Sequence, residues 1–465
     1  MNRSFFSLIW ILLLIPLLGH TTANESTVAF INVNVIPMDS ERILEGQTVL
    51  IENGIIKEIG HATEVSVPGD AVQVEGGGKF LIPGLSEMHA HIPPPPASPP
   101  DDWDEEAFHQ WVENVLFLYV AAGVTTARGM LGHPMHLELR ERVENGELTG
   151  PRIWTSGPSV NGNSVQTVER AREIPAEQKA AGYDFIKIHP GLKREVYEAL
   201  YEAAQEADFW YAGHVPAEVG VLRALETGYL SIDHLDGYIE ILIADDADDL
   251  PSAQFFGFNL TDYVDENKIS EAAQRTKEAG VWNVPTQILF ESILSGNDPE
   301  EMAAWPEMRY VPQPMLNNWK ERTRNFHNSP NYTPERAGQF INIRRQLIKA
   351  LHNEGAGLLL GADSPQWWNV PGFAVHRELK TYVASGLTPY EALKTGTVNV
   401  AHFFEITDEA GTIEQGKRAD MVLLAANPLD NIGNTEMIEG VMIRGEWFPE
   451  DAIEARLEEI AESYE

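Results

Sequence analysis

The residues best suited to chemistry begin with two histidines, His89 and His91, separated by one alanine. They follow an apolar run at residues 80–85 that predicts a buried strand. In an extended segment, side chains two positions apart point to the same side, so both imidazoles can reach one cation. A chain with 14 histidines produces this spacing by accident often enough, so the pair needs support from other ligands.

Four further ligand-type residues close later apolar runs, each of which predicts a short buried strand. They are Lys187, His214, His234 and Asp363. Taken singly, a terminal lysine is usually a surface residue, a histidine a bonded core group and an aspartate a helix cap. Because barrel active sites form where the carboxyl ends of parallel strands gather, five agreeing strand ends predict one site.

The elements that must position these residues alternate in type between residues 82 and 400. Short apolar runs alternate with longer helical patterns, which is typical of βα units around a parallel sheet. We expect strands near residues 81–85, 123–127, 152–156, 184–188, 210–214, 230–234, 281–285 and 357–362. Eight such strands predict a (β/α)8 TIM barrel, enlarged by insertions beyond the usual ~250 residues. Insertions at 92–105 and 287–345 follow strand ends and are candidates for lids, with packing decoration as the alternative.

Both ends of the chain predict a second, smaller domain. Short β-type runs occupy residues 24–81, with a hairpin turn expected at Glu52-Asn53-Gly54. A similar pattern of short β-type runs between turn residues occurs at 411–448. We therefore expect residues 24–81 and 401–465 to form one composite β-sandwich with a C-terminal helix. His61 and His402 fall outside the strand ends and are interpreted as structural.

The first residues predict export. Arg3 precedes an apolar run at 5–18, and small residues follow up to Ala23. This pattern is typical of a signal peptide, here residues 1–23. No later stretch is long and apolar enough to cross a bilayer. We expect a secreted or periplasmic protein without stable membrane insertion.

Composition excludes several classes of function. The chain has no cysteine, which excludes disulfides, thiolate metal sites and a cysteine nucleophile. It has 70 acidic against 33 basic side chains and a net charge of −37, which disfavours binding to nucleic acid or anionic membranes. The expected partner is a small molecule, and a homo-oligomer stays open.

The order of the candidate ligands resembles that of the amidohydrolase superfamily over most of the chain. That family carries His-x-His on strand one, lysine on strand four, histidines on strands five and six, and aspartate on strand eight. The motifs that carry the resemblance are IPGLSEMHAH at 82–91, GHVP at 213–216, SIDH at 231–234, GAD at 361–363 and GKRAD at 416–420. They are similar to its imidazolonepropionase-like and Xaa-Pro dipeptidase-like branch. After strand two that branch often carries Arg-Asp, whereas here Gly129 follows Arg128, so substrate contacts from that loop do not transfer.

The resemblance implies a hydrolase with two divalent metal ions. The implied metal ligands are His89, His91, Lys187, His214, His234 and Asp363, with Lys187 carbamylated as the bridge between the ions. Nitrogen and oxygen ligands suit zinc first, with manganese or cobalt as alternatives. A metal-activated hydroxide would attack the carbonyl, with Asp363 as general acid and base. A one-metal site that leaves His234 as a hydrogen-bond donor is the alternative.

Residues near the same strand ends are candidates for contact with substrate. Tyr238 is expected to act in catalysis, by hydrogen-bonding an oxyanion or a substrate carboxylate. The substrate-binding candidates are His189, Tyr238, Gln366, Trp367, His376 and Arg377. The expected reaction is hydrolysis of an amide bond in a dipeptide or an N-acyl amino acid. Ester, lactone or phosphotriester hydrolysis on the same site is the alternative, followed by a non-catalytic binding protein.

Overall fold

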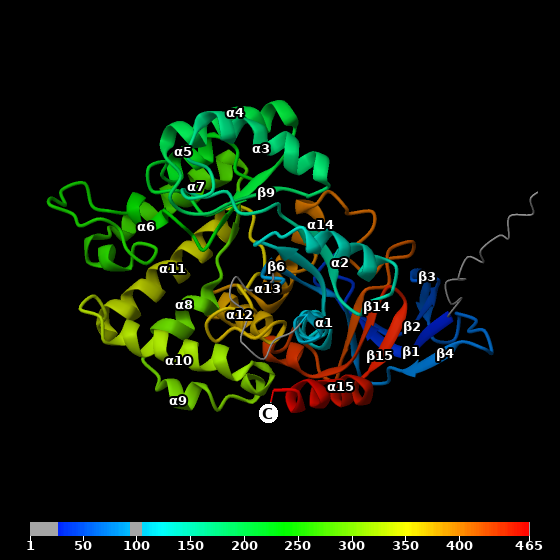
Figure 1. The fold of residues 1–465 in the computed structure, drawn as a ribbon. Coiled ribbons are helices and arrows are strands. Elements are labelled where there is room, and N and C mark those ends of the chain that lie inside the picture. Colours follow the sequence, from blue (N-terminus) through cyan, green and yellow to red (C-terminus); the bar gives the residue numbers. More distant parts are fainter. Residues whose placement is uncertain (1–26, 94–104, 465) are drawn as a thin grey trace, which may run out of the picture.

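The computed structural model describes residues 27–93 and 105–464. The predicted signal peptide and nearly all of the predicted insertion at 92–105 lie outside the described residues. Within the described part of the chain, no helix is both long enough and apolar enough to cross a membrane. Figure 1 shows a large α/β body with a smaller sheet at one side, to which the blue and red ends of the chain contribute.

Both ends of the chain build one sheet. Its order is β15-β14-β13-β5-β1-β2-β3, with β4 beside β1. The strands are β1 (Thr27–Val35), β2 (Leu44–Glu52), β3 (Ile55–His61), β4 (Val72–Glu75), β5 (Phe80–Pro83), β13 (Met421–Leu424), β14 (Ile438–Ile443) and β15 (Glu446–Pro449). Antiparallel pairing of β5 with β13 sets Leu81 opposite Leu423. The two ends of the chain therefore pair with each other in one hydrogen-bonded sheet.

The hairpin between β2 and β3 forms where its turn residues predict it. Asn53 has a φ of 54° and Gly54 a φ of 75°, and two-residue hairpin turns of this kind require positive φ at both positions. A Cβ atom at Gly54 would lie 2.8 Å from the carbonyl oxygen of Arg444. Glycine therefore allows both the turn and its close approach to the loop before β15, and the predicted turn is confirmed.

Short parallel strands surround the centre of the larger body. They are β6 (Leu85–Ala90), β7 (Val124–Gly129), β8 (Arg152–Thr155), β9 (Ile186–Ile188), β10 (Tyr211–Gly213), β11 (Ser231–Asp233) and β12 (Trp282–Val284). They form two ladders, β6-β7-β8 and β12-β11-β10-β9. Single parallel bridges join the ladders: Ser156 to Phe185, Asn283 to Leu358 and Ala90 to Ser364. Residues 358–364 thus occupy the eighth position, and the strands follow one another around a ring.

Helices lie between the strands and cover the outside of this ring (Figure 1). The α-helices are α1 (Glu105–Ala121), α2 (Met135–Glu144), α3 (Val168–Ala181), α4 (Arg194–Ala207), α5 (Val221–Glu226), α6 (Tyr238–Ile241), α7 (Ile269–Ala279), α8 (Gln287–Leu294), α9 (Pro299–Met302), α10 (Gln313–His327), α11 (Pro334–Glu354), α12 (Phe373–Ala384), α13 (Pro389–Thr395), α14 (Val398–Phe403) and α15 (Glu450–Glu462). Short 3-10 helices are η1 (Phe258–Tyr263), η2 (Glu266–Lys268), η3 (Pro306–Tyr310) and η4 (Ile432–Glu436).

Helix α11 shows how local sequence sets these elements. The Thr333 side chain accepts a hydrogen bond from the backbone N–H of Arg336, Pro334 occupies the first turn, and Gly355 ends the helix with a φ of 73°. Its buried face repeats every three or four residues: Ala337, Phe340, Ile343, Arg344, Leu347, Ile348 and Leu351. One arginine therefore stands in an otherwise apolar stripe that faces the barrel.

The predicted insertion at 287–345 is mostly helical and includes α8, α9, η3, α10 and the start of α11. Thr323 of α10 accepts hydrogen bonds from the indole N–H groups of Trp367 and Trp368, both at 2.8 Å. These bonds attach α10 to the chain that leaves the eighth barrel position. The insertion therefore packs beside the carboxyl ends of the strands.

Candidate active site

The two histidines at the end of β6 share one side of the strand. His89 is the fifth residue of β6 and His91 follows its last residue. Their rings stack with centroids 5.4 Å apart. The side chain of His89 is 2% exposed and that of His91 is 19% exposed. The spacing thus places one imidazole in the interior and the other nearer to solvent.

Asp363 meets this pair from the eighth position. Its Oδ1 lies 2.9 Å from His91 Nε2 and 3.7 Å from His89 Nε2. Asp363 has a φ of 63°, as does His234. A non-glycine residue in this left-handed region costs about 1–3 kcal/mol and persists where the surroundings hold it, often at functional sites.

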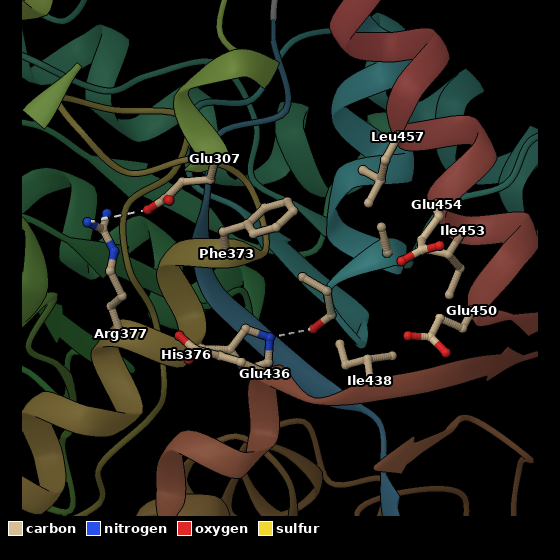
Figure 2. Close-up of a pocket in the computed structure, with 12 residues that line it drawn as sticks. Glu307, Phe373, His376, Arg377, Glu436, Ile438, Glu450, Ile453, Glu454 and Leu457 are labelled. Atoms are coloured by element: carbon tan, nitrogen blue, oxygen red, sulfur yellow. Dashed lines mark hydrogen bonds and ion pairs between the residues drawn. The ribbon is translucent and has the colours of Figure 1, made fainter. Parts of the chain in front are cut away.

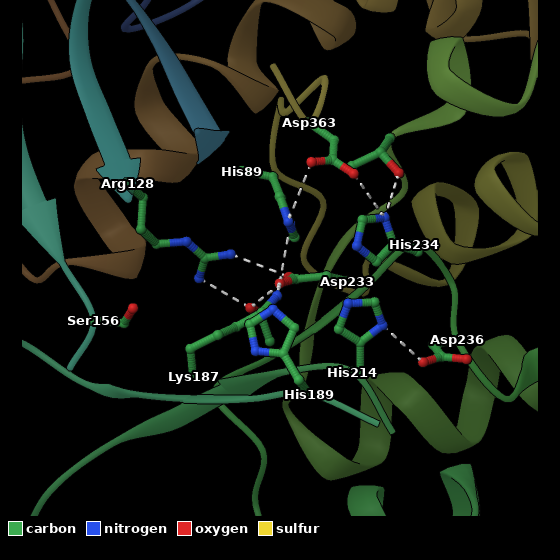
Figure 3. Close-up of polar contacts among 12 residues, drawn as sticks. His89, Arg128, Ser156, Lys187, His189, His214, Asp233, His234, Asp236 and Asp363 are labelled. Carbon is green, nitrogen blue, oxygen red and sulfur yellow. Dashed lines mark hydrogen bonds and ion pairs between the residues drawn. The ribbon is translucent and has the colours of Figure 1, made fainter. Parts of the chain in front are cut away.

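The later histidines complete the cluster (Figure 3). His214 follows β10 and His234 follows β11. The His234 ring centroid lies 4.5 Å from that of His89 and 4.7 Å from that of His214. Ligand atoms of His89, His234 and Asp363 all lie within 4.8 Å of one another. His91 and His214 flank this group on its two sides.

Three of these histidines are oriented through Nδ1. Each Nδ1 faces a side-chain oxygen at 2.8 to 3.2 Å: Asp236 for His214, Thr286 for His234 and Asp233 for His89. Metal-binding histidines usually make such a second contact through the nitrogen that does not bind the ion. The Nε2 atom of each ring is therefore left for a metal.

Two buried atoms at the centre have no partner in hydrogen-bonding geometry: His89 Nδ1, despite its short distance to Asp233, and Asp363 Oδ1. A buried carboxylate oxygen without a partner is costly. A divalent cation held by Asp363 and the imidazoles would satisfy that oxygen. The nitrogen and oxygen donors suit zinc, manganese or cobalt, so the residues present fit a metal centre.

Burial sets the protonation states that a metal needs. It lowers the pKa of His89 to about 4 and that of His234 well below its usual value. Burial alone would raise the pKa of Asp363, but interactions with His89 and His91 bring it below its ordinary value. Neutral imidazoles and an ionised carboxylate are the forms that ligate cations.

Lys187 of β9 lies beneath the histidines in a buried charge network. Its Nζ donates to Asp233 Oδ2 at 3.0 Å, and Arg128 donates to the other oxygen at 3.1 Å. Burial lowers the pKa of Lys187, against the attraction of Asp233. Arg128 also donates to the backbone oxygen of Met88 at 2.7 Å. Arg128 is therefore an internal residue that braces β6 and β11.

A buried glutamate supports the centre from below. Glu87 Oε1 accepts hydrogen bonds from the backbone N–H groups of His89 at 3.0 Å and Ala362 at 2.8 Å. It thereby ties β6 to the segment that carries Asp363. Burial raises the pKa of Glu87 to about 8. Sequence reasoning missed this residue, whose one signal is its position two residues before His89, on the same side of the strand.

Arg344 of α11 reaches the site from outside the ring. Its guanidinium donates to the backbone oxygens of His234 and Pro285, both at 2.7 Å, and lies 3.7 Å from the centroid of the Phe290 ring. These two carbonyls flank the contact between His234 and Thr286. Sequence reasoning also missed Arg344, whose one signal is an arginine at a core position of a helix.

Tyr238 lies outside the cluster, and its catalytic and substrate-binding roles stay predictions that this placement does not support. Its side chain is buried, and its hydroxyl lies 2.7 Å from Thr276 Oγ1 of α7. Burial raises the pKa of this hydroxyl to about 12. The physical reason is the turn at Gly237, where a φ of 80° starts α6 and directs Tyr238 into the core.

His189 lies beside the metal residues. Its ring centroid is 5.3 Å from that of His214, and its Nδ1 is 2.8 Å from Ser159 Oγ. Burial lowers the pKa of this imidazole. The structure thus brings His189 to the cluster (Figure 3), and its contact with substrate stays a prediction.

Gln366 and Trp367 follow Asp363 closely in the chain. Trp367 packs against Phe255 with ring centroids 6.2 Å apart. Gln366 is partly exposed and pairs through its backbone with Asn369. Contact of either side chain with substrate stays a prediction.

His376 and Arg377 lie away from the cluster, and their role in substrate binding stays a prediction that this placement does not support. Nε2 of His376 is 3.0 Å from the backbone oxygen of Ala122, and its Nδ1 is 3.0 Å from Thr435 Oγ1. Both residues line a cavity of about 310 Å³ between α1, α12 and α15 (Figure 2). Arg377 donates to the backbone oxygen of Trp368 there. Helix α12 carries them away from the strand ends, which adjacency to Asp363 in sequence does not reveal.

Known proteins resemble the chain at the level of sequence and of fold. A 5-methylthioadenosine/S-adenosylhomocysteine deaminase of Caldanaerobacter subterraneus subsp. tengcongensis is 24% identical over 430 residues, which cover 85% of this chain and 84% of that protein. The structure of a Xaa-Pro dipeptidase with bound methionine superposes with a TM-score of 0.67 at 20% identity, over 91% of this chain and all of that one. Bottromycin amidohydrolase superposes with a TM-score of 0.71 at 20% identity, over 94% of this chain and 90% of that one.

These structural likenesses and the family match confirm the predicted TIM barrel with an additional domain. The model of the Amidohydrolase family matches residues 80–448, which contain every histidine, lysine and aspartate of the cluster. The chain therefore belongs to the amidohydrolase family and is a hydrolytic enzyme that acts on carbon–nitrogen bonds.

Proposed function

We propose that this enzyme uses divalent metal ions to cleave an amide bond in a dipeptide or an N-acyl amino acid. The observation that carries the proposal is the convergence of His89, His234 and Asp363, whose ligand atoms lie within 4.8 Å of one another. The buried Oδ1 of Asp363 also supports it: it lies 2.9 Å from His91 Nε2 without hydrogen-bond geometry, and a cation there would offset its desolvation.

The proposed metal ligands have different roles. His89, His91 and Asp363 would hold one ion, and His214 and His234 the second. When bound, the ions would acidify a water and polarise the scissile carbonyl. Asp363 lies between the two groups of histidines. Its Oδ1 is 2.9 Å from His91 Nε2, and its Oδ2 is 4.0 Å from His234 Nδ1. Its ionised carboxylate would take a proton from the attacking water and return it to the leaving amine.

Lys187 is proposed as the bridge between the ions. Its amine would form a nitrogen–carbon bond with CO2 and release one proton, which yields a carbamate whose single negative charge is shared by two oxygens. Complete burial and a lowered pKa support this, because only the neutral amine adds to CO2. In the one-metal alternative, Lys187 keeps its ion pair with Asp233, and His234 acts as a hydrogen-bond donor.

The substrate class is proposed from the chemistry of the site and the names of similar proteins. A Xaa-Pro dipeptidase and a bottromycin amidohydrolase share the fold. The alternative is hydrolysis of an ester, lactone or phosphotriester, because the same activated water attacks those centres. Rates on matched amide and ester substrates, with zinc-, manganese- and cobalt-loaded protein, distinguish the two.

The direct test of the mechanism is Asp363→Asn. The amide retains an oxygen ligand but cannot accept a proton, so we expect most of the metal to remain and kcat to fall at least ~10²-fold. Metal content by elemental analysis and steady-state rates give the two readouts. Near-normal turnover would remove Asp363 from the mechanism.

We also propose that the protein acts outside the cytoplasm. The apolar run at 5–18 and the small residues that end at Ala23 support this proposal. Its test is described at the scale of the whole molecule below.

A further inference from the structure

One cation beside the site makes no hydrogen bond or ion pair with the residues that the structure describes. Among the described residues, Arg322 of α10 is the one arginine that makes neither a hydrogen bond nor an ion pair; its one recorded contact is with an aromatic ring. The chain has 70 acidic side chains, and arginines on its surface elsewhere lie against carboxylates, as Arg324 does against Glu300. A free guanidinium in such an acidic protein requires an explanation.

Arg322 is held in place although it is free. Its guanidinium carbon lies 4.1 Å from the centroid of the Trp367 ring, and this stacking leaves the edge of the planar group, with its N–H donors, uncovered. The Trp367 indole is itself fixed by its hydrogen bond to Thr323, the neighbour of Arg322 in α10. The cation is therefore oriented before any ligand arrives, while the residue stays exposed to solvent.

A strip of aromatic rings connects Arg322 to the metal residues. The Phe256 ring lies 5.3 Å from His234 and 5.7 Å from Phe255, and Phe255 lies 6.2 Å from Trp367. Phe255 and Phe256 are half-buried, so part of each ring is uncovered. The strip therefore begins at a proposed metal ligand and ends under the guanidinium.

Arg322 also lies within electrostatic reach of the proposed proton carrier. Desolvation lowers the pKa of Arg322, and the negative charge of Asp363 opposes that shift. Trp367, on which Arg322 stacks, follows Asp363 by four residues, so the guanidinium lies beside the chain segment that carries Asp363.

We infer that Arg322 binds a carboxylate of the substrate, and that the strip formed by Phe255, Phe256 and Trp367 contacts an apolar group next to that carboxylate. Guanidinium groups bind carboxylates through two parallel N–H donors, which gives direction as well as energy. This inference rests on the proposed function. It specifies the substrate as an N-acyl amino acid or dipeptide with a free carboxylate and an apolar side chain.

The experiment compares two substrates that differ in the carboxylate alone. N-acetyl-L-phenylalanine and N-acetylphenethylamine carry the same scissile amide and the same ring, and both release acetate. Metal-loaded wild type is compared with Arg322→Gln, which removes the charge, and with Arg322→Lys, which keeps the charge without the planar donors. Arg324→Gln is the matched control, because it removes a charge two positions away on the same helix.

We expect Arg322→Gln to lower kcat/KM for the acid about 10- to 100-fold, mainly through KM, the usual scale for a hydrogen-bonded charge. Arg322→Lys should recover part of that loss. The neutral amide should change by less than about threefold in every variant, and Arg324→Gln should resemble wild type for both substrates. Equal losses on both substrates, or no loss on the acid, would overturn the inference.

Calorimetric binding of the two compounds separates this inference from the proposed function. If wild type binds the acid more tightly than the amide and Arg322→Gln abolishes the difference, the assignment of Arg322 holds even where neither compound is hydrolysed. If both are hydrolysed but charge affects neither binding nor rate, the proposed function holds and Arg322 has no role in specificity.

Discussion

Single residues converge on the proposed metal site because strand alternation places them on one side. Glu87, His89 and His91 occupy alternate positions, so one side of the β6 end carries both imidazoles and the carboxyl that anchors Asp363 through Ala362. Each position has its own task. The buried carboxyl of Glu87 fixes the spacing between β6 and the segment that carries Asp363, while the imidazoles of His89 and His91 offer nitrogen lone pairs to a cation.

Replacement of Lys187 distinguishes a two-metal site from a one-metal site. Lys187→Ala should lose much of the metal and nearly all activity, because two cations would lack their shared anionic ligand. A short acid such as acetate or propionate should restore part of the rate by occupying the vacated space. Elemental analysis and turnover with and without the acid are the measurements.

The control for this prediction is Lys193→Ala, which removes an exposed lysine before α4. It should leave metal content and rate unchanged. Full metal and full rate in Lys187→Ala would refute the carbamate bridge.

Glu87 predicts a pH dependence of stability. Its pKa is raised from 4.5 to about 8 in the folded protein, chiefly by burial. Between these values the folded state holds a proton that the unfolded state has released, so the stability this group contributes is present at low pH and is lost as pH rises toward about 8. The fall in Tm of metal-free protein between about pH 5 and 8 should therefore be shallower in Glu87→Gln.

Glu64→Gln, at an exposed position, serves as the control and should retain the wild-type slope. Parallel curves for Glu87→Gln and wild type would contradict the predicted linkage.

Whether the sequence predicts the place of a site residue depends on whether that residue lies at the end of a strand. His89, His91, His214, His234, Lys187 and Asp363 end strands or follow them, so alternation and barrel geometry bring them together. Tyr238, His376 and Arg377 lie in helices that begin after sharp turns, and adjacency in sequence misplaced them. Arg344 and Thr286 act through contacts between distant segments, which no local pattern encodes.

At the scale of elements, α11 acts as an external brace for the second half of the metal cluster. The Arg344 guanidinium donates to backbone oxygens after β11 and after β12, and its Nε also donates to Oε1 of Gln287 at 2.9 Å. Glu378 of α12 meets the same region by accepting hydrogen bonds from the backbone N–H groups of Gln287 and Ile288. The start of α8, and with it Thr286, is therefore fixed by two outer helices.

Arg344→Met should test this brace. Loss of the donors leaves the buried carbonyl of His234 without its partner and removes one of the two donors to the carbonyl of Pro285, so we expect the free energy of unfolding to fall by about 2–4 kcal/mol. Metal affinity should fall about 10- to 100-fold, because the orientation of His234 is no longer set. Denaturant titration and competition with a chelator measure the two effects.

Arg345→Met is the matched control, because the neighbouring arginine makes a partly exposed ion pair with Glu291 at 2.7 Å. It should cost less than about 1 kcal/mol and leave metal affinity unchanged. If Arg344→Met loses stability but keeps full metal affinity, the brace serves the fold alone.

At the scale of the whole molecule, composition fixes how the chain can be stabilised, since without cysteine it must fold without disulfides. The net charge of −37 favours solubility through self-repulsion, and a core of apolar side chains in both domains replaces covalent cross-links. The sequence predicts the alternation of strands and helices because the spacing of apolar residues within each short segment indicates its type. The sequence predicts a strand at 357–362 in the eighth position, whereas the structure joins this segment to its neighbours through isolated bridges at Leu358 and Ser364 and a few further backbone hydrogen bonds.

Export predicts that the mature protein begins near Asn24. Leu13→Arg should break the apolar run and keep the chain in the cytoplasm, because a charged residue there disfavours insertion. Mass analysis of the native N-terminus and cell fractionation give the result. Met1 intact on soluble native protein would contradict the prediction.

The pairing of β5 with β13 has a consequence for the timing of folding. Leu81 finds its partner Leu423 only after the entire barrel has been synthesised, and contacts between such distant segments form late because the intervening chain must first be closed into a loop. Until then, the outer edge of β5 stays without its neighbour. The smaller sheet is therefore completed only when the last strands of the chain have been synthesised, so its first strands must wait for partners that emerge from the ribosome at the end.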